Sequence, residues 1–531
     1  MFNKSSFVRD STGLVKEFSA TDALAMAMSN IGLTYVFDTC TFYVAAYPQA
    51  NIMITTVIGL LLALPMVGLF SLFTIAMPRT GGDYVWVSRT LSPSLGFICS
   101  FVTTVMWLSM IGTVFPVSIN WGAAAWIYQL GLLYGSPSYI GLAKYLTGPE
   151  PAFWLSIVQT IIAGIIVLGS TRLTRGIVRY WTYWGVIIGV VFIVMILTVG
   201  QSTFISNFNA LSGANYYQVI KDGQAVGAYA GIPPIFSGST LLGGAIRMLA
   251  IVGFNASVYF SGELKNVRKS QYLGQIGALV IFVAFETLIV IVMYLGMGPS
   301  FANAMAMLWY VGSSNFPWVT LPQAAGLSIF WVPNPFLSSL YSLTYMGSGM
   351  IITIAILFIY TRNLFAWSFD RLMPAALADV NPKTGTPFKA TFVMILIAIF
   401  FDYVVTYQYG IVGSMLTYMT AGLMVVYIVI GIAGMIFPYR RREVFEASHP
   451  AVTRKISGIP VISILGLLTL ISGVAVEYAL LLPAITNFGY IVATGILPTF
   501  LIGAILYAII WTVRRRQGIN LEFVGKLIPP E

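Results

Sequence analysis

Long apolar runs alternate with short polar segments along nearly the whole chain. Twelve of these runs are candidate membrane-spanning helices, because about 20 consecutive apolar residues are needed to cross roughly 30 Å of hydrocarbon. With Gly, Pro and charged residues as delimiters, the runs are 20–46, 52–77, 94–130, 152–169, 176–200, 241–261, 272–296, 336–360, 390–407, 410–437, 460–482 and 488–513. The first run is longer than a signal-peptide core and no small-residue cleavage pattern follows it. The pattern therefore predicts an all-α polytopic membrane protein whose first helix is retained.

The basic residues fall mainly in alternate polar segments. If the N-terminus is cytoplasmic, 24 of the 27 Lys and Arg residues lie on the cytoplasmic side. Outside there are Lys144 and Lys221, and Arg247 lies within the sixth run. The positive-inside rule then predicts a multi-pass protein of the cell membrane with both termini in the cytoplasm. The formal net charge of +10 is accounted for by this topology and gives no reason to expect a nucleic-acid partner.

Composition narrows the class further. With 58% hydrophobic and 8% charged residues, the chain is unlike soluble domains, in which about 25% of residues are charged. A single histidine, His449, and two cysteines, Cys40 and Cys99, argue against metal centres or catalytic triads built on histidine. We therefore expect no cofactor, no metal site and no enzymatic activity.

Two of the outside segments are long. In the first, Asp222-Gly223 separates two short alternating runs, which favours a β-hairpin with a type I′ turn. The second, 299–335, is aromatic-rich and contains apolar stretches too short to span a membrane. We expect interfacial half-helices there, packed over the outer mouth either as a static cover or as a moving lid.

The first and sixth runs contain polar interruptions near their middles. Residues 29–32 read Ser-Asn-Ile-Gly and residues 252–255 read Val-Gly-Phe-Asn. Broken backbone at this depth is tolerated only where it lines a cavity enclosed by protein, and there its free N–H and C=O groups can bind a ligand. Alternatively, Gly and Asn could simply allow close packing of helices. Their occurrence at the starts of two five-helix halves of opposite orientation favours an inverted-repeat transporter.

Three cytoplasmic segments carry a family resemblance. Residues 78–97 read PRTGGDYVWVSRTLSPSLGF, residues 261–266 read SGELKN, and residues 361–387 read TRNLFAWSFDRLMPAALADVNPKTGTP. In order and topology, these segments resemble the signatures of the amino acid–polyamine–organocation transporter superfamily. The resemblance covers nearly the whole chain, and the third segment is the most specific.

The resemblance implies one transporter domain over residues 1–531, with 12 transmembrane helices in a five-plus-five inverted repeat. The first repeat would span about 20–200, the second about 241–437, and two additional C-terminal helices about 460–513. Helices 1 and 6 would be discontinuous, and their unwound segments would bind the substrate. Those segments comprise Asn30, Ile31, Gly32, Leu33 and Thr34, and Val252, Gly253, Phe254 and Asn255. Relatives commonly carry Glu at the position of Asn255.

Ionisable residues inside spans are functional candidates, since each costs at least about 2.5–3.5 kcal/mol at the bilayer centre. Asp38 and Arg247 each lie roughly 9 Å outward of the two interruptions at about 1.5 Å rise per residue. We predict that they form an ion pair, either as a gate in the outer vestibule or as a purely stabilising bridge. Glu286 and Glu477 lack an obvious basic partner. Glu286 is the candidate for proton coupling, and the alternative is a neutral, hydrogen-bonded carboxyl that joins helices.

The predicted function is a secondary active transporter, an amino acid permease that works by alternating access. Sodium-coupled relatives place hydroxyl side chains in the eighth helix where this chain has Ile351 and Ile352, with Thr353 adjacent, so sodium coupling is disfavoured and proton coupling or exchange is expected. The alternatives are a sodium-coupled amino acid symporter, a transporter of polyamines or organic cations, and a substrate sensor on the same scaffold. The expected partners are a small-molecule substrate, the lipid bilayer and a coupling proton.

Overall fold

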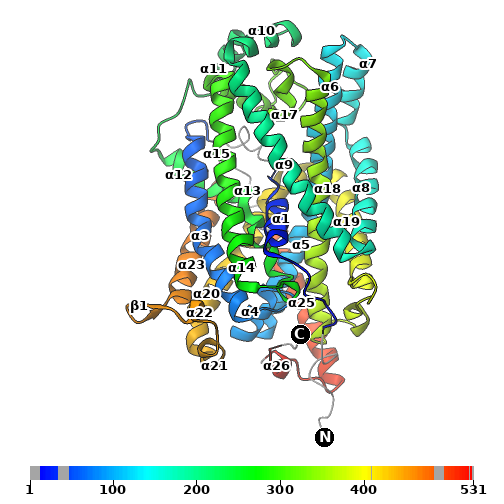
Figure 1. The fold of residues 1–531 in the computed structure, drawn as a ribbon, viewed down its shortest axis with the longest axis vertical. Helices are drawn as coiled ribbons and strands as arrows, with labels where there is room; N and C mark the ends of the chain where they lie inside the picture. Colours follow the sequence, from blue (N-terminus) through cyan, green and yellow to red (C-terminus); the bar gives the residue numbers. More distant parts are fainter. Residues whose placement is uncertain (1–11, 34–46, 408, 483–494, 526, 529–531) are drawn as a thin grey trace.

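The computed structural model describes residues 12–33, 47–407, 409–482, 495–525 and 527–528, and residues 409–415 through their backbone alone. Long helices run side by side along the long axis of the molecule (Figure 1). In the described part of the chain, the only strands are β1 (Lys455–Ile456) and β2 (Ile459–Pro460), which pair antiparallel. The prediction of an all-α polytopic protein is confirmed.

Eleven segments of the described chain are long and apolar enough to cross a membrane. In chain order they are α3 (Ile52–Ala76), the succession α5 (Pro93–Val117), η2 (Ser118–Ala123) and α6 (Ala124–Leu133), α8 (Pro149–Gly169), α9 (Thr171–Val199), the succession α12 (Gly238–Ile246), α13 (Met248–Ile251) and η3 (Val252–Val258), the succession α14 (Val267–Gln271), η5 (Tyr272–Gly277) and α15 (Ala278–Met297), α18 (Pro335–Phe369), α19 (Phe388–Tyr407), α20 (Tyr409–Arg440), α23 (Val461–Leu481) and α25 (Leu497–Arg516).

These segments correspond one by one to the second through twelfth predicted spans. The first predicted span begins as α1 (Ala20–Ile31), and residues 34–46, which would complete it, lie outside the described part. Several helices extend beyond the apolar run that predicted them; α18, for example, ends at Phe369 rather than near residue 360. Polar residues continue a helix readily once they are past the hydrocarbon layer, so hydropathy marks membrane contact and not the end of the helix.

Shorter elements occupy the two ends of the bundle. They are α4 (Asp83–Thr90), α7 (Pro137–Leu146), α10 (Gln201–Leu211), α11 (Tyr216–Ala225), η4 (Ser261–Glu263), α16 (Pro299–Tyr310), α17 (Ala324–Leu327), η6 (Ser328–Phe330), η7 (Ala375–Ala378), α21 (Arg442–Glu446), α22 (Pro450–Thr453) and α26 (Leu521–Val524). Figure 1 places α7, α10 and α11 at the end opposite the two chain termini. We call that end the outer end and the end with the termini the inner end.

The helix beginnings follow from local sequence. Ser19 caps α1 in a capping box, in which its hydroxyl accepts from the N–H of Asp22 while the Asp22 carboxylate accepts from the N–H of Ser19. Ser92 caps α5 immediately before Pro93, and Asn334 caps α18 immediately before Pro335. Proline suits the first helical position because the N–H that it lacks would have no partner there.

The hairpin predicted around Asp222-Gly223 is wrong, because these residues lie inside helix α11. Asn215 caps this helix, and Gln218 donates to Asp222 one turn later at 2.7 Å. Gly223 packs so closely on α16 that an added Cβ would lie 2.3 Å from the Cβ of Ala304. The glycine therefore serves a helix contact, which local turn preference does not reveal.

The 299–335 segment forms short helices, α16 and α17, as predicted. The side chain of Gln129 on α6 donates to the carbonyl of Ala325 in α17 at 2.9 Å, and Trp331 donates to the carbonyl of Gly296 at 3.1 Å. These bonds attach the segment to the outer ends of the spans.

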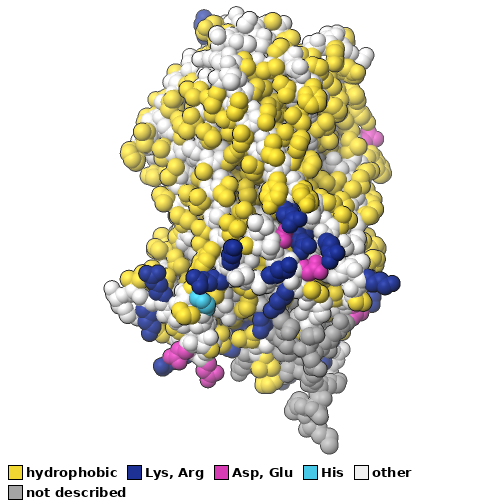
Figure 2. Space-filling view, in the orientation of Figure 1, with side chains coloured by type: hydrophobic (Ala, Val, Ile, Leu, Met, Phe, Trp, Pro, Cys, Tyr) yellow, Lys and Arg dark blue, Asp and Glu magenta, His cyan; other side chains and the backbone are white. Residues whose placement is uncertain are grey.

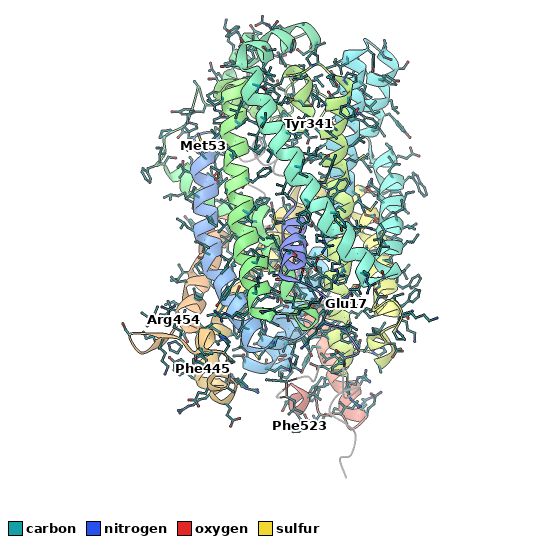
Figure 3. All side chains as sticks on the ribbon, viewed as in Figure 1. Glu17, Met53, Tyr341, Phe445, Arg454 and Phe523 are labelled. Atoms are coloured by element: carbon teal, nitrogen blue, oxygen red, sulfur yellow. The ribbon has the colours of Figure 1, made fainter. Side chains whose placement is uncertain are left out.

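The surface shows how the bundle meets its surroundings. On the face shown in Figure 2, apolar side chains cover the upper and middle parts, and Lys and Arg gather toward the inner end. Only 6% of the apolar window of α25 is buried, which leaves the rest of that helix to contact lipid. The two labelled residues Tyr341, on α18 in the upper half, and Glu17, below the start of α1, indicate the outer and inner levels (Figure 3).

Candidate functional site

The first helix stops at its polar interruption. Helix α1 ends at Ile31, and Gly32 takes the left-handed conformation with φ 88° and ψ 62°. Only glycine adopts this conformation without steric cost, so the residue type determines where the helix ends. Asn30, in the last turn, is buried and its Oδ1 atom has no hydrogen-bond partner. The end of α1 therefore presents a buried polar atom that can accept a hydrogen bond from a ligand.

The sixth helix changes type at its own interruption. It is α-helical to Ile251 and becomes a 3₁₀ helix, η3, over Val252–Val258. Runs of 3₁₀ helix longer than three or four residues are uncommon and often mark a functional site. The expected unwinding is therefore a tightening of the helix rather than an open gap.

The two interruptions touch. Asn30 Nδ2 donates to the carbonyl oxygen of Gly253 at 3.1 Å. A Cβ added to Gly253 would lie 2.4 Å from the carbonyl oxygen of Asn30, so only glycine allows this approach of the two backbones.

A cavity of about 600 Å³ lies where the two interruptions meet. Of the predicted substrate residues, five line it: Asn30, Ile31, Gly32, Val252 and Gly253. The other wall residues were not predicted as substrate residues and include Trp107 and Met110 of α5, Phe282 of α15, Ile352 of α18 and Met419 of α20. Whether these residues line the cavity depends on which spans lie next to one another, and hydropathy does not reveal that.

The cavity extends toward the outer end. Trp309 at the end of α16 and Leu321 in the following segment line it, as does Tyr407 at the end of α19. Among the described residues no Asp, Glu, Lys or Arg lines it. The chamber is therefore uncharged and mostly apolar, with polar groups at the helix interruptions and on Thr113, Asn120, Thr147 and Thr406.

The remaining predicted substrate residues lie elsewhere. Leu33 lines a much smaller neighbouring cavity, and Thr34 lies outside the described residues. Phe254 packs against the rings of Phe70 and Tyr427, with centroid distances of 5.9 and 6.0 Å. Asn255 donates to the hydroxyls of Tyr259 and Tyr427. Phe254 and Asn255 therefore do not appear in the wall of the large cavity.

Glu286 is not a lone carboxyl, so that expectation is wrong. Its Oε1 atom lies 2.5 Å from Nη2 of Arg247, and both side chains are fully buried. Gly59 of α3 makes room for this pair, since an added Cβ there would lie 2.9 Å from the Cβ of Arg247. Asp38, the partner predicted for Arg247, lies outside the described residues, so that ion pair stays a prediction.

Comparison with known proteins decides the class. The sequence model of the family described as "Amino acid permease" matches residues 18–512. The chain belongs to the amino acid permease family. It is therefore a multi-pass membrane transporter of the amino acid–polyamine–organocation superfamily and not an enzyme.

Characterised relatives of the permease are distant. It is similar to the branched-chain amino acid permease BcaP of Lactococcus lactis, at 22% identity over 84% of this chain and 86% of the relative. It is also similar to the methylthioribose transporter of Bacillus subtilis, at 22% identity over 91% and 94%. A third relative, the branched-chain amino acid permease BcaP of Bacillus subtilis, is 23% identical over 52% and 51%.

Two buried ion pairs lie toward the inner end of the permease and do not line the cavity. Arg362 binds Glu263 through two bonds of 2.9 and 3.0 Å, and Arg89 lies 2.7 Å from Asp370. Burial by itself would lower the pKa of the Arg89 guanidinium, but the Asp370 carboxylate raises it above its usual value. Two-point contact of Arg with a carboxylate fixes geometry as well as charge.

The segment before α1 is attached to this inner region. The backbone N–H of Phe18 donates to the carbonyl of Glu263, and the N–H of Lys265 donates to the carbonyl of Phe18. Asp22 lies within 3.3 Å of Arg179 and 3.9 Å of Arg175 on α9. The inner halves of the first and sixth helices are therefore joined to each other and to α9.

Among the described residues, two buried carboxyls have no arginine partner, and sequence reasoning missed both. Asp402, within the ninth span, accepts from Thr160 at 2.7 Å, and its Oδ1 has no partner. Asp83 follows the glycine pair of the first family motif and is fully buried. A carboxyl inside the apolar run 390–407 was a visible signal for Asp402. Asp83 gave none, because hydropathy alone assigns it to a polar loop.

Proposed function

We propose that this permease transports neutral, apolar amino acids by alternating access. The observation that carries the proposal is the cavity of about 600 Å³ at the contact between the two interrupted helices. At the interruptions, the Asn30 side chain and backbone groups can hold an amino acid's ammonium and carboxylate. Thr113, Asn120 and Thr406 add polar groups elsewhere in the wall. Most of the remaining wall is apolar and suits an aliphatic side chain.

The absence of charged residues from the described wall argues against a polyamine or a cationic amino acid. A buried cation without a nearby carboxylate pays a desolvation penalty that apolar contacts do not offset. Two relatives named as branched-chain amino acid permeases agree with an aliphatic substrate. Because one relative is named as a methylthioribose transporter, methylthioribose must be tested as a substrate as well.

The distribution of open and closed regions supports alternating access. The cavity reaches the outer end, while Arg362, Glu263, Arg89 and Asp370 fill the inner side as buried pairs. This arrangement fits an outward-facing state of a five-plus-five inverted repeat in which helices 1 and 6 carry the substrate site. Return of the substrate to the inner side would then require these pairs to separate.

Sodium coupling receives no support from the eighth helix. Ile351 and Ile352 adjoin the small cavity beside Gly32, which has three hydroxyl groups. Those of Ser29 and Thr182 bond each other at 2.9 Å, and that of Ser348 donates to the carbonyl of Thr344 at 2.9 Å. A cation site needs several oxygen ligands that are free to coordinate. We therefore propose proton coupling or exchange.

The test is counterflow into proteoliposomes that contain purified permease and a high internal concentration of unlabelled substrate. We expect labelled leucine, isoleucine or valine to accumulate transiently, and lysine, putrescine and methylthioribose to compete weakly. If none of these labelled amino acids accumulates, the proposal is contradicted. Strong competition by putrescine would instead indicate a polyamine substrate.

A matched pair of variants locates the site. Ile352→Phe adds bulk to the cavity wall, whereas Ile505→Phe adds the same bulk on α25, where the side chain is 58% exposed. We expect I352F to lower leucine counterflow at least about tenfold, since overpacking a filled site costs about 1–3 kcal/mol, and I505F to leave it unchanged. Equal effects of the two variants would place the site elsewhere.

A further inference from the structure

Asp83 is a buried carboxyl in an environment of neutral groups. It is the first residue of α4, and its side chain is 1% exposed. Its Oδ1 accepts from the N–H of Tyr84 at 2.9 Å, and its Oδ2 accepts from Thr103 at 3.3 Å and from Tyr259 at 3.4 Å. Every other buried carboxyl of the described chain except Asp402 has an arginine within 4.0 Å. Asp83 therefore differs from a structural ion pair.

A chain of hydrogen bonds joins Asp83 to the substrate cavity. Asn255 Nδ2 donates to the hydroxyl of Tyr259 at 3.2 Å and to that of Tyr427 at 2.9 Å. Each hydroxyl hydrogen is then left for a second acceptor. For Tyr427 this acceptor is the carbonyl of Val252 at 3.3 Å, and for Tyr259 it is Asp83. Val252 lines the cavity.

The charge state of Asp83 determines how this chain can be arranged. As a carboxylate, Asp83 accepts from Tyr259. A protonated carboxyl carries one O–H donor and keeps its other oxygen as an acceptor. Because Oδ1 accepts from the backbone N–H of Tyr84, the added proton goes to Oδ2. That O–H then donates, and the Tyr259 hydroxyl, which already accepts from Asn255, turns its hydrogen away from Oδ2. Asn255 holds both tyrosines, so a change at one end of the chain reaches the carbonyl of Val252 at the other. Asp402 lacks such a connection, because its described partner is Thr160.

We propose that Asp83 is a proton-binding site whose occupancy is coupled to substrate binding through Tyr259, Asn255 and Tyr427. The proposal rests on the proposed transport function and assigns its coupling ion to a residue. Coupling between two ligands is reciprocal, so the proton must alter substrate affinity by the factor by which substrate alters proton affinity.

The neighbours of Asp83 allow titration near neutral pH. The titratable groups that face it are Cys99 of α5, Tyr259 after η3, Tyr360 of α18 and Tyr427 of α20. All of these are neutral at pH 7. On its own helix, Tyr84 and Arg89 are both engaged with Asp370. Burial raises the pKa of Asp83 to about 7, and the hydrogen bonds from Tyr84, Thr103 and Tyr259 oppose the rise.

The sign of the effect follows from that raised pKa. When the inner side opens and water reaches Asp83, its pKa should return toward the unperturbed value of about 3.9. The closed inner side therefore binds the proton more tightly, is favoured at acid pH, and loses that stabilisation as the pH rises from about 4 through about 7. Because the cavity in this state reaches the outer end, we expect substrate binding from outside to tighten as the pH falls from 8 to 5.

The experiment measures leucine affinity by thermal shift of the full-length purified permease and leucine counterflow in proteoliposomes, both at equal pH on the two sides from pH 5 to 8. For the wild type we expect affinity to change about 5- to 100-fold over this range, which is typical of coupled sites. In Asp83→Asn, which cannot titrate, we expect a flat profile. The control Glu477→Gln, in the peripheral helix α23, should keep the wild-type profile.

A second variant tests the connection without removing the carboxyl. Tyr259→Phe deletes a bond that stabilises the charged form, so the midpoint of the pH profile should move to higher pH. A role for Asp83 limited to starting helix α4 would move no midpoint. If Asp83→Asn does not fold, the Tyr259→Phe midpoint decides the question.

The outcomes separate the two proposals. Counterflow in the wild type with an unaltered pH profile in Asp83→Asn, or an unmoved midpoint in Tyr259→Phe, would overturn the proton site and leave the transporter proposal standing. Absence of counterflow and of ligand-induced stabilisation in the wild type would overturn the proposed function itself.

Discussion

The outer and inner halves of the molecule, taken from the contact between Asn30 and Gly253, are built differently. The outer half holds a cavity of about 600 Å³ whose described lining contains no charged residue. The inner half holds the buried pairs Arg362–Glu263 and Arg89–Asp370, and stacked rings such as Phe73 and Trp86, whose centroids are 5.3 Å apart. The outer half also has a buried pair, Arg247–Glu286, which does not line the cavity.

The difference shows how the permease can bind substrate in its outer half while its inner half resists opening. An apolar void forfeits contacts that a substrate can restore, so the outer half gains from binding. Directional ion pairs hold only in one geometry, so the inner half resists gradual opening and should separate as a unit. The predictions below each disturb one side of this comparison.

The largest effect is expected at the inner pair. Glu263→Gln leaves the Arg362 guanidinium buried without a counter-charge, which costs about 3–5 kcal/mol. We expect a clear fall in the melting temperature of the purified permease. The control Glu446→Gln alters an exposed pair on α21 and should change little. Equal melting temperatures for the two variants would show that the inner pair contributes nothing to stability.

A double variant sharpens that result. Replacing both Glu263 and Arg362 with Met removes the charges together, and buried pairs replaced by apolar residues of similar volume often lose little stability. We expect most of the lost stability to return while transport stays impaired, since the directional contact is gone. Thermal unfolding and leucine counterflow on the same preparation measure both. Full recovery of transport would assign the pair to stability alone.

A smaller effect is expected at the contact between the halves. Gly253→Ala inserts a methyl group 2.4 Å from the carbonyl oxygen of Asn30, so the two interrupted helices must separate, at about 1–3 kcal/mol for overpacking. Substrate affinity should fall roughly tenfold or more, as measured by ligand-induced thermal shift. Gly141→Ala is the matched control, because an added Cβ there has no heavy atom within 4 Å. An unchanged substrate affinity in G253A would show that the contact between Asn30 and Gly253 does not support the substrate site.

The smallest effect concerns the attachment of α1 to α9. Thr182→Val keeps the side-chain shape but removes the hydroxyl that bonds Ser29 at 2.9 Å, and a typical buried hydrogen bond contributes about 1 kcal/mol. We expect a small fall in melting temperature. Thr198→Val, at an exposed position of the same helix, should lower it less. A larger fall for the exposed site would contradict a stabilising role for the buried bond.

Much of the architecture was predictable from the sequence, for identifiable physical reasons. Eleven predicted spans were found, because the energy of hydrocarbon contact depends on local composition. Gly32 ends α1 where the polar interruption predicted it, since glycine alone adopts that conformation freely. The helical cover at 299–335 was likewise predicted from stretches too short to span.

Other parts were not predictable, because they depend on which residues meet across the bundle. Asp222-Gly223 has the preferences of a turn, but contact with Ala304 selects a helix. Glu286 has no basic neighbour along the chain, yet Arg247 reaches it from another helix. Asp402 was overlooked although its run displayed a carboxyl.

By itself the sequence determined the class of molecule, the order of its spans and the places where two of them are interrupted, because those properties follow from hydropathy and from the backbone freedom of single residues. Only the tertiary structure decided which side chains enclose the cavity, which carboxylates obtain an arginine and which, like Asp83, remain among neutral donors. Those outcomes depend on distances between residues far apart in the chain, and a buried charge is stabilised or left unpaired according to its neighbours in space.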